Sequence, residues 1–304
     1  MLTIGTRGSA LALAQAHWVA GKLQALCPDT RVKIQVITTS ADKHPTTSIR
    51  SGTSTGVFVK EIEEALLASA IDLAVHSMKD LPTRMPDGLE IAAIPQREDA
   101  RDALVGGAGV HRLEDLGPDA VIGTGSVRRQ AQILALRPHL RVKDIRGNVQ
   151  TRLQKLAARS YDALILACAG LNRLGLQDRI SVRLEFSQML PAPGQGALAL
   201  EVRKGDSRVR MMVEALNEPV TATAVLAERA FLCRMGGGCN SPIAVHARPA
   251  GGNMRIDGLV ANPDGTRLLR DSSVCPVASA AEAAEALADK MLSEGGAGIL
   301  RSLR

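Results

Sequence analysis

Short apolar runs of strand length alternate along most of the chain with segments in which apolar residues recur at helical spacing. The strand-like runs lie at 3–6, 32–36, 71–76, 89–94, 121–123, 162–167 and 198–202. The helical segments include 10–26 and 207–216, each of which follows a strand-like run. A regular alternation of strands and helices predicts an α/β fold in which helices cover the faces of the sheets.

Two crossings at 95–99 and 191–196, which contain Pro with Gly or charged residues, divide this pattern. They indicate hinge segments through which the chain leaves a first α/β domain, passes through a second and returns. After Glu218 come a helix over 221–235, three strand-like runs and a closing helix from 278, which together predict a small α+β domain. We therefore expect domain 1 at 1–96 and 197–217, domain 2 at 97–196 and domain 3 at 218–304.

One stretch of domain 1, from Thr39 to Gly56, follows neither periodicity and consists largely of Ser, Thr, Gly, Pro and charged residues. It precedes a segment in which Phe58 and Ile62 mark one face of a helix and Lys60 the other. Structureless loops of this length are often active-site lids. We expect this loop to act as a lid.

The composition narrows the class of partner. The 304 residues carry a formal charge of +6, which points to anionic partners. One Trp, one Tyr and three Phe supply few of the aromatic rings on which single-stranded nucleic acids stack. The chain has no apolar run of membrane-spanning length and no amphipathic basic segment that would lie on a membrane. We therefore expect a small polyanionic ligand, with no nucleic acid and no membrane as partner.

The cysteines and the first residues indicate a compartment. Five scattered cysteines make a poor disulfide framework and suit a reducing environment. The sequence has no CxxC pair and its histidines are dispersed, so we expect no metal site. Because the chain reads straight into a strand without an apolar signal segment, we expect a cytoplasmic protein.

Several arginines stand where a strand turns into a helix, at turns where Ser9, Ser126 and Asn148 are expected to cap the helices. Such a turn exposes free backbone N–H groups and the positive end of the helix dipole, which together attract anions. A cation in the first turn of a helix is unfavourable unless an anion joins it. Any single arginine could be an ordinary surface residue, but repeated placement at equivalent turns indicates a site for carboxylates or phosphates. The arginines concerned are Arg7, Arg128, Arg129, Arg146 and Arg152.

Two further residues could carry chemistry. Asp80 follows a buried-type strand directly, beside Lys79 and before Pro82. A carboxylate in basic surroundings stays ionised, so Asp80 could stabilise a cationic intermediate or accept N–H donors. Cys239 follows three glycines, and basic surroundings would favour its thiolate. The alternative for Cys239 is a pliable turn that carries an inert, small apolar side chain.

A specific resemblance emerges from motifs in this order along nearly the whole chain: Val75-His76-Ser77-Met78-Lys79-Asp80, Gly123-Thr124-Gly125-Ser126-Val127-Arg128-Arg129-Gln130, Arg146-Gly147-Asn148, Gly194-Gln195-Gly196 and Gly237-Gly238-Cys239. Together they resemble the porphobilinogen deaminase family, also called the hydroxymethylbilane synthases. The resemblance implies two like domains with the hinged fold of periplasmic binding proteins, plus a small α+β domain. It also implies that four porphobilinogen molecules are joined head to tail with release of ammonia, and that water then releases the linear tetrapyrrole for porphyrin and haem synthesis.

The resemblance also implies roles for individual residues. A dipyrromethane cofactor would be held by a thioether to Cys239, and Asp80 would contact pyrrole N–H groups and stabilise the cation formed as ammonia leaves. The cofactor-binding residues implied are Lys79, Asp80, Thr124, Ser126, Arg128, Arg129, Arg146 and Gln195. The substrate-binding residues implied are Arg7, Ser9, Lys60, Arg146, Arg152 and Arg173.

Two positions depart from the family pattern, and two other functions stay open. Thr55 stands where the family often has a lysine, and Gly125-Ser126 replaces the more usual pair of serines. A non-catalytic module that binds a small polyanion is the main alternative, although it would not need Cys239. A nucleic-acid-binding regulator is a weaker one, because no recognition-helix motif is evident. We expect a monomer.

Overall fold

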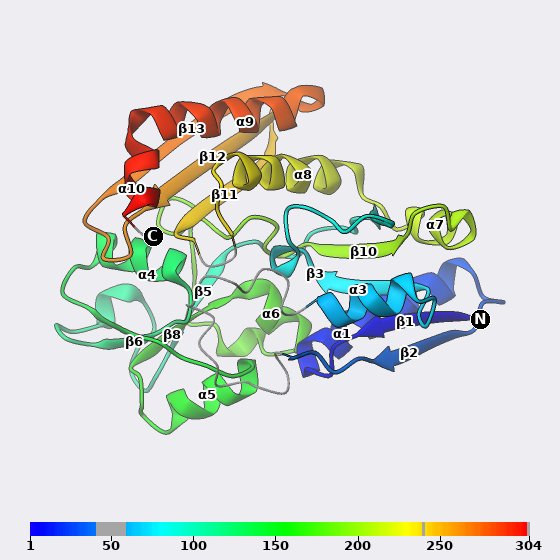
Figure 1. Cartoon of the computed structure of the whole chain (residues 1–304). Coiled ribbons are helices and arrows are strands. Elements are labelled where there is room, and N and C mark those ends of the chain that lie inside the picture. Colours follow the sequence, from blue (N-terminus) through cyan, green and yellow to red (C-terminus); the bar gives the residue numbers. More distant parts are fainter. Residues whose placement is uncertain (41–58, 239–240, 303–304) are drawn as a thin grey trace. The chain divides into compact units, whose positions relative to one another are not determined.

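A computed structural model describes residues 1–40, 59–238 and 241–302 of the chain. The chain forms two compact units, Met1–Glu98 with Gly196–Ala222 and Asp99–Gln195 with Thr223–Arg304 (Figure 1). The first unit matches the expected domain 1 closely, whereas the second holds the sheets expected of domains 2 and 3, so the three-domain division stays a prediction. Most of the expected lid, at 41–56, lies outside the described residues.

The first unit contains a five-stranded sheet in the order β2-β1-β3-β10-β4. Its strands are β1 (Leu2–Thr6), β2 (Val32–Val36), β3 (Leu73–Ser77), β4 (Leu89–Ala93) and β10 (Leu198–Arg203), and its helices are α1 (Ala10–Leu26), α3 (Lys60–Leu67) and α7 (Ser207–Glu214). Strands β1, β2 and β3 are parallel, and β10 runs antiparallel between β3 and β4. The sequence therefore predicted these elements correctly but not the reversed direction of β10.

The second unit repeats this arrangement in a sheet of order β7-β6-β8-β5-β9. Its elements are β5 (Asp102–Gly106), β6 (Val121–Gly123), β7 (Arg141–Lys143), β8 (Ala163–Ala167), β9 (Val182–Leu184), α4 (Val127–Leu136), α5 (Val149–Ala157) and α6 (Cys168–Arg173). Strand β5 takes the place of β10 and is likewise antiparallel to its neighbours. Each crossing of the chain thus leads into the reversed strand of a sheet. The expected fold of two like α/β halves is confirmed.

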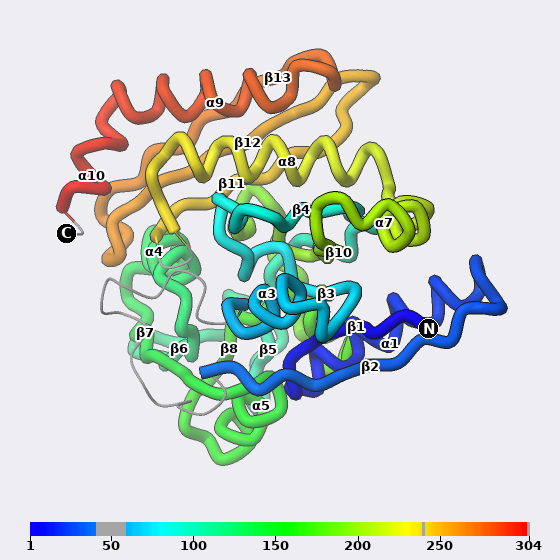
Figure 2. The backbone as a smooth tube through the Cα atoms, turned by 45° about the vertical axis from the view of Figure 1, so that its right-hand side comes forward, coloured from blue at the N-terminus to red at the C-terminus, as the bar shows by residue number. Residues whose placement is uncertain are grey.

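The second unit also contains a three-stranded antiparallel sheet, as expected for an α+β part. It comprises β11 (Ile243–Ala250), β12 (Asn253–Ala261) and β13 (Leu268–Pro276), with helices α8 (Pro219–Arg234), α9 (Ala280–Met291) and α10 (Ala297–Arg301). Helices α8 and α9 run along this sheet (Figure 2), and their side chains share one buried core with it. The other face of the sheet packs Ala244 and Leu259 against Ala131 of α4 and Leu190. Burial of both faces joins this sheet to the rest of the unit.

The described helices include none that is long and apolar enough to span a bilayer. The described residues form three sheets, each with its own buried core. Within these cores the strands follow the burial expected from their sequences. In β3, four consecutive residues are buried, as predicted for a run without polar alternation.

Gly258 offers a test of core packing. A Cβ atom there would lie 2.7 Å from Cζ of Phe231 and 3.0 Å from Sδ of Met291, and both neighbours are fully buried. We expect Gly258→Ala to lower the free energy of unfolding by about 1–3 kcal/mol, because a packed aromatic ring has to move. Gly298→Ala is the matched control in α10, where an added Cβ meets nothing within 4 Å. Chemical denaturation would compare the free energy of unfolding of each variant with that of the wild type. A Gly258→Ala variant as stable as the wild type would contradict the packing argument.

Candidate functional site

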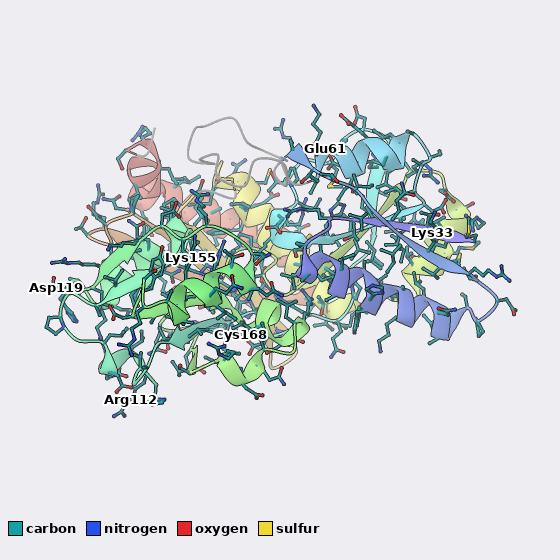
Figure 3. The ribbon with its side chains drawn as sticks, turned by 90° about the horizontal axis from the view of Figure 1, so that it is seen from below. Lys33, Glu61, Arg112, Asp119, Lys155 and Cys168 are labelled. Atoms are coloured by element: carbon teal, nitrogen blue, oxygen red, sulfur yellow. The ribbon has the colours of Figure 1, made fainter. Side chains whose placement is uncertain are left out.

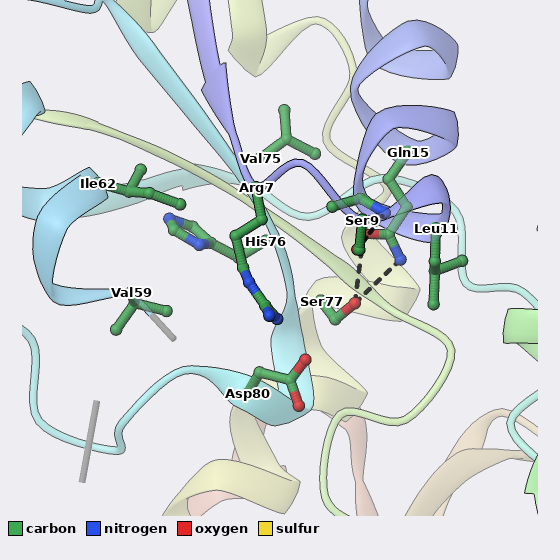
Figure 4. Close-up of a pocket in the computed structure, with 11 residues that line it drawn as sticks. Arg7, Ser9, Leu11, Gln15, Val59, Ile62, Val75, His76, Ser77 and Asp80 are labelled. Carbon is green, nitrogen blue, oxygen red and sulfur yellow. Dashed lines mark hydrogen bonds between the residues drawn. The ribbon is translucent and has the colours of Figure 1, made fainter. Parts of the chain in front are cut away.

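The first unit has a pocket beyond the C-terminal ends of β1 and β3 (Figure 4). Its walls come from the turn that leads into α1, from α1 itself, from the start of α3 and from the end of β3. The lining residues are Arg7, Ser9, Leu11, Ala12, Gln15, Val59, Ile62, Val75, His76, Ser77 and Asp80. Parallel strand ends of this kind are the usual ligand sites of α/β sheets.

Local sequence places the polar groups of this pocket. Ser9 caps α1, and its hydroxyl accepts a hydrogen bond from Ala12 N at 3.2 Å, as predicted. Gln15 donates from Nε2 to the Ser77 hydroxyl at 2.9 Å, which ties α1 to β3. Asp80 ends the 3₁₀ turn Met78–Asp80, and Figure 4 shows Arg7 extending towards it. The structure therefore brings Arg7, Ser9 and Asp80 together around one pocket.

A buried ionisable cluster lies behind this pocket. His76 Nε2 is 2.9 Å from Glu201 Oε2, and both side chains are almost completely buried. Burial, reinforced by the charge of Glu201, raises the pKa of nearby Glu63 to about 7. The sequence motifs gave no separate role to His76 or to the two glutamates. The available signal was a glutamate within the apolar run Leu198–Val202, which a fully buried strand accommodates only with a partner.

In the second unit, both predicted helix caps are confirmed. Ser126 Oγ accepts from Arg129 N at 3.4 Å at the start of α4, and Asn148 Oδ1 accepts from Thr151 N at 2.9 Å at the start of α5. Thr124 is buried and its hydroxyl accepts from Ser126 N at 3.2 Å, which shapes the turn before α4. These caps place the arginines of both junctions.

Arg128 and Arg129 share an internal anion that sequence reasoning missed. Asp102 Oδ2 accepts from Arg128 Nη1 at 2.7 Å, and Asp102 Oδ1 accepts from Arg129 Nη2 at 2.7 Å. Burial alone would raise the pKa of Asp102, but the two guanidinium charges outweigh it and hold that pKa below its ordinary value. The anion that we expected these arginines to need is therefore supplied in part by the chain itself. Its sequence signal was an aspartate at the start of the apolar run 103–105.

Gln195 belongs to the same network. Its side chain is completely buried, and Nε2 donates to Asp102 Oδ1 at 2.9 Å and to Ala100 O at 2.8 Å. Arg129 Nη2 approaches Gln195 Oε1 at 3.4 Å. The second crossing is thus bonded to the first turn of α4 through side chains, and the cofactor contact implied for Gln195 stays a prediction.

Arg152 lies in a concentration of positive charge. Its Nε donates to Gly147 O at 2.8 Å, while Arg146 Nε donates to Asp144 Oδ2 at 2.8 Å. Lys155 on α5 (Figure 3) donates to Arg146 O at 3.1 Å. Burial, together with the charges of Arg129 and Arg146, lowers the pKa of Arg152 to about 10. Among the described residues, Arg129, Arg146, Arg152 and Lys155 outnumber the carboxylates Asp102 and Asp144 that pair with them, as a site for carboxylates requires.

The remaining predicted residues are more scattered. Lys60 begins α3 and is exposed, 3.9 Å from Glu64, whereas Lys79 is partly buried in the turn that contains Asp80. Arg173 is the last residue of α6 and is partly buried. Cys239 and Thr55 lie outside the described residues. Lys60 and Lys79 belong to the first unit, and Arg173 belongs to the second, as do the arginines around Arg152.

The glycine turn before Cys239 is described as far as Gly238. Gly236 has a φ of 66°, in the region that favours glycine, as expected for a turn. At Gly237 an added Cβ would clash with the side chain of Ile243. Both glycines therefore have local reasons to be where they are.

The departure at Gly125 also has a structural reason. A Cβ at this position would lie 3.1 Å from Asp144 Oδ1 and 3.1 Å from Ile145 O. A serine would press against this neighbouring segment, which carries the partner of Arg146. Glycine lets the two turns approach closely, at the loss of the hydroxyl that a second serine would supply.

Comparison with known proteins agrees along the whole length. A model of the "Porphobilinogen deaminase, dipyromethane cofactor binding domain" matches residues 2–211, and one of the "Porphobilinogen deaminase, C-terminal domain" matches residues 222–293. A porphobilinogen deaminase of Thermus thermophilus is 48% identical over 305 residues, covering 100% of this chain and 99% of that protein. One of Deinococcus radiodurans is 46% identical with the same coverage.

Similarity to solved structures is weaker. The immunogenic lipoprotein A of Vibrio vulnificus is 13% identical, with a TM-score of 0.44, over 75% of this chain and 99% of that one. A likeness at this level supports no conclusion about function. The two family models and the full-length relatives show that this chain belongs to the porphobilinogen deaminase family.

Proposed function

We propose that this chain is a hydroxymethylbilane synthase whose reaction depends on Asp80 in the first unit and on the arginines around Arg152 in the second. As a transferase of the porphobilinogen deaminase family, it joins four porphobilinogen molecules head to tail with release of ammonia. The family's cofactor is dipyrromethane, which serves as the primer to which the protein adds porphobilinogen units. Hydrolysis then releases the linear tetrapyrrole used in porphyrin and haem synthesis.

The single observation that carries the assignment of residues is the partly buried guanidinium of Arg152, whose pKa is lowered by desolvation and by the charges of Arg129 and Arg146. Desolvated cations repel one another, and the cost falls when an anion joins them. Porphobilinogen and dipyrromethane carry acetate and propionate side chains, so each added ring brings two further carboxylates. The donor set therefore fits the cofactor, and we propose that Arg129, Arg146 and Arg152 bind carboxylates of cofactor and substrate.

Asp80 has the complementary role. The aminomethyl carbon of porphobilinogen becomes positively charged as ammonia leaves. Stabilisation of such developing charge by a fixed group of opposite charge is often the largest contribution to catalysis. Asp80 is partly buried in the pocket lined by Arg7 and Ser9. We propose that Asp80 accepts pyrrole N–H groups and stabilises this cation, while Arg7 and Ser9 bind a substrate carboxylate.

Other roles rest on the family resemblance. Cys239 would anchor the cofactor through a thioether, so that each condensation takes place on an attached chain and is effectively intramolecular. The residues that would contact or position the cofactor are Lys79, Thr124, Ser126, Arg128 and Gln195. Lys60 and Arg173 would attract substrate by charge. We propose a monomer of three domains in the cytoplasm, whose reducing conditions suit the four free cysteines among the described residues.

Replacing Asp80 tests its charge. Asp80→Asn keeps the shape of the side chain but removes the negative charge, and we expect ammonia release from porphobilinogen to fall by about 10²–10³-fold. Asp87→Asn is the matched control, since Asp87 is an exposed carboxylate of the same unit outside the pocket. If Asp80→Asn turned over at the wild-type rate, Asp80 would have no such role. A wild-type chain that binds porphobilinogen without releasing ammonia would instead be a non-catalytic binding module.

The cofactor attachment is tested by mass. We expect the intact protein to carry the added mass of two linked pyrroles, mapped by peptide mass spectrometry to Cys239. Cys239→Ser should lack this mass and be inactive, because a hydroxyl does not form the thioether. Cys233→Ser is the control, because Cys233 is an exposed free thiol six positions earlier and its loss should leave the modification intact. An active wild-type protein with unmodified Cys239 would contradict the assignment.

A further inference from the structure

The buried cluster of His76, Glu201 and Glu63 has no role in the function derived so far. His76 and Glu201 lie on neighbouring antiparallel strands, where His76 pairs with Ala199 and Glu201 with Ala74. The imidazole lines the same pocket as Asp80, although only 5% of His76 is exposed. Glu63 Oε1 and Glu201 Oε1 are buried without a hydrogen-bond partner among the described residues. A cluster with unsatisfied carboxylate oxygens is costly to bury, which calls for an explanation.

The atom balance of the reaction demands a base. Joining two porphobilinogen units forms a bond between the aminomethyl carbon of one and the unsubstituted ring carbon of the other. Ammonia leaves with the electron pair of its C–N bond, and the attacking ring must then lose the hydrogen of its reacting carbon to recover aromaticity. Asp80 must remain negatively charged throughout to stabilise the cation. Acceptance of this proton by another group would leave that charge intact.

The geometry points to His76 as this base, and we propose that its Nδ1 takes the ring proton after each carbon–carbon bond forms. The proposal rests on the proposed function of the Asp80 pocket. In this proposal His76 Nε2 is the donor in the 2.9 Å contact and Glu201 Oε2 the acceptor, so the ring proton of the neutral imidazole lies on Nε2. In the neutral ring the lone pair is then on Nδ1, which has no hydrogen-bond partner among the described residues.

The surrounding charges favour transfer of a proton to this ring. The groups that face His76 are Glu201 from β10, Glu63 from α3, and Arg7 and Asp80 in the pocket. Burial, reinforced by the charge of Glu201, raises the pKa of Glu63, so Glu63 adds little negative charge beside the imidazole near neutral pH. Uptake of the ring proton produces an imidazolium ion that pairs with Glu201 and neutralises the cluster.

The step balances without another reactant. The C–H bond of the reacting ring carbon breaks, its electron pair returns to the ring, and the proton forms a bond with Nδ1. The imidazolium passes this proton to water or to the departing ammonia before the next addition. Glu201 acts through the imidazole, as a positioning residue that fixes the tautomer.

His76→Gln tests the proposal while keeping an amide N–H at the position of Nε2 to donate to Glu201. We expect kcat to fall by about 10²-fold, the lower end for loss of general base catalysis. Proton removal should become rate-limiting, so porphobilinogen deuterated at its unsubstituted ring carbon should show a primary isotope effect larger than with the wild type.

His246→Asn is the matched control, because it disrupts another buried histidine–glutamate pair, His246 Nδ1 with Glu228 Oε1 at 3.2 Å, in the second unit. It should leave the isotope effect unchanged. A His76→Gln enzyme with wild-type kcat, or with reduced kcat but no larger isotope effect, would overturn the proposal. If the wild-type chain releases no ammonia, the proposed function itself fails. If it does, and Asp80→Asn is inactive, only the role of His76 is in question.

The titration of Glu63 gives a separate test of the cluster's charge. Its pKa is about 7 in the folded chain and near 4.5 when exposed, so between these values only the native state holds the proton. The stability contributed by this protonation is therefore lost as pH rises from about 4.5 to 7. Glu63→Gln lacks this loss, and its stability relative to wild type should increase from pH 5 to pH 8 in denaturant titrations. A pH-independent difference would show that Glu63 is ionised throughout.

Discussion

The second unit depends on one buried carboxylate shared by two arginines. Asp102 starts β5, Arg128 and Arg129 form the first turn of α4, and Gln195 adds the end of the second crossing. Arg128 Nη1 also donates to Leu190 O at 2.6 Å, and Arg129 Nη1 to Ile165 O at 3.0 Å. Loss of the carboxylate would leave two buried cations, a change that typically costs about 3–5 kcal/mol. Strand, helix and crossing are therefore held together by charge as well as by apolar packing.

This network also leaves positive charge for a ligand. One carboxylate cannot offset two guanidinium groups, and Arg146 and Arg152 add to the surplus. The first unit has the opposite balance, because Asp80 faces its pocket and His76, Glu201 and Glu63 form a buried cluster with more acidic than basic groups. The proposed binding of carboxylates and the proposed stabilisation of a cation therefore fall in different units, each with its own fixed charges.

Local features could be predicted from the sequence because they depend on a few neighbouring residues. Ser9, Ser126 and Asn148 cap their helices, and Gly236 has the positive φ that its turn needs. Strands β5, β7 and β9 are absent from the predicted runs, and β7 and β9 have only three residues each, too few to show a period by themselves. The ionic clusters were missed for a different reason, since Asp102 lies 26 positions from Arg128 and His76 lies 125 from Glu201.

The sequence alone determined the class of fold and the family, because periodicity, helix caps and ordered motifs are properties of the chain itself. Only the tertiary structure decided what those residues meet. It buried Arg128 and Arg129 on Asp102, brought Arg152 beside Arg129 and Arg146, and placed His76 between Glu201 and the Asp80 pocket. The physical reason is that burial and charge pairing depend on distances between strands and helices, and the order of residues does not specify those distances.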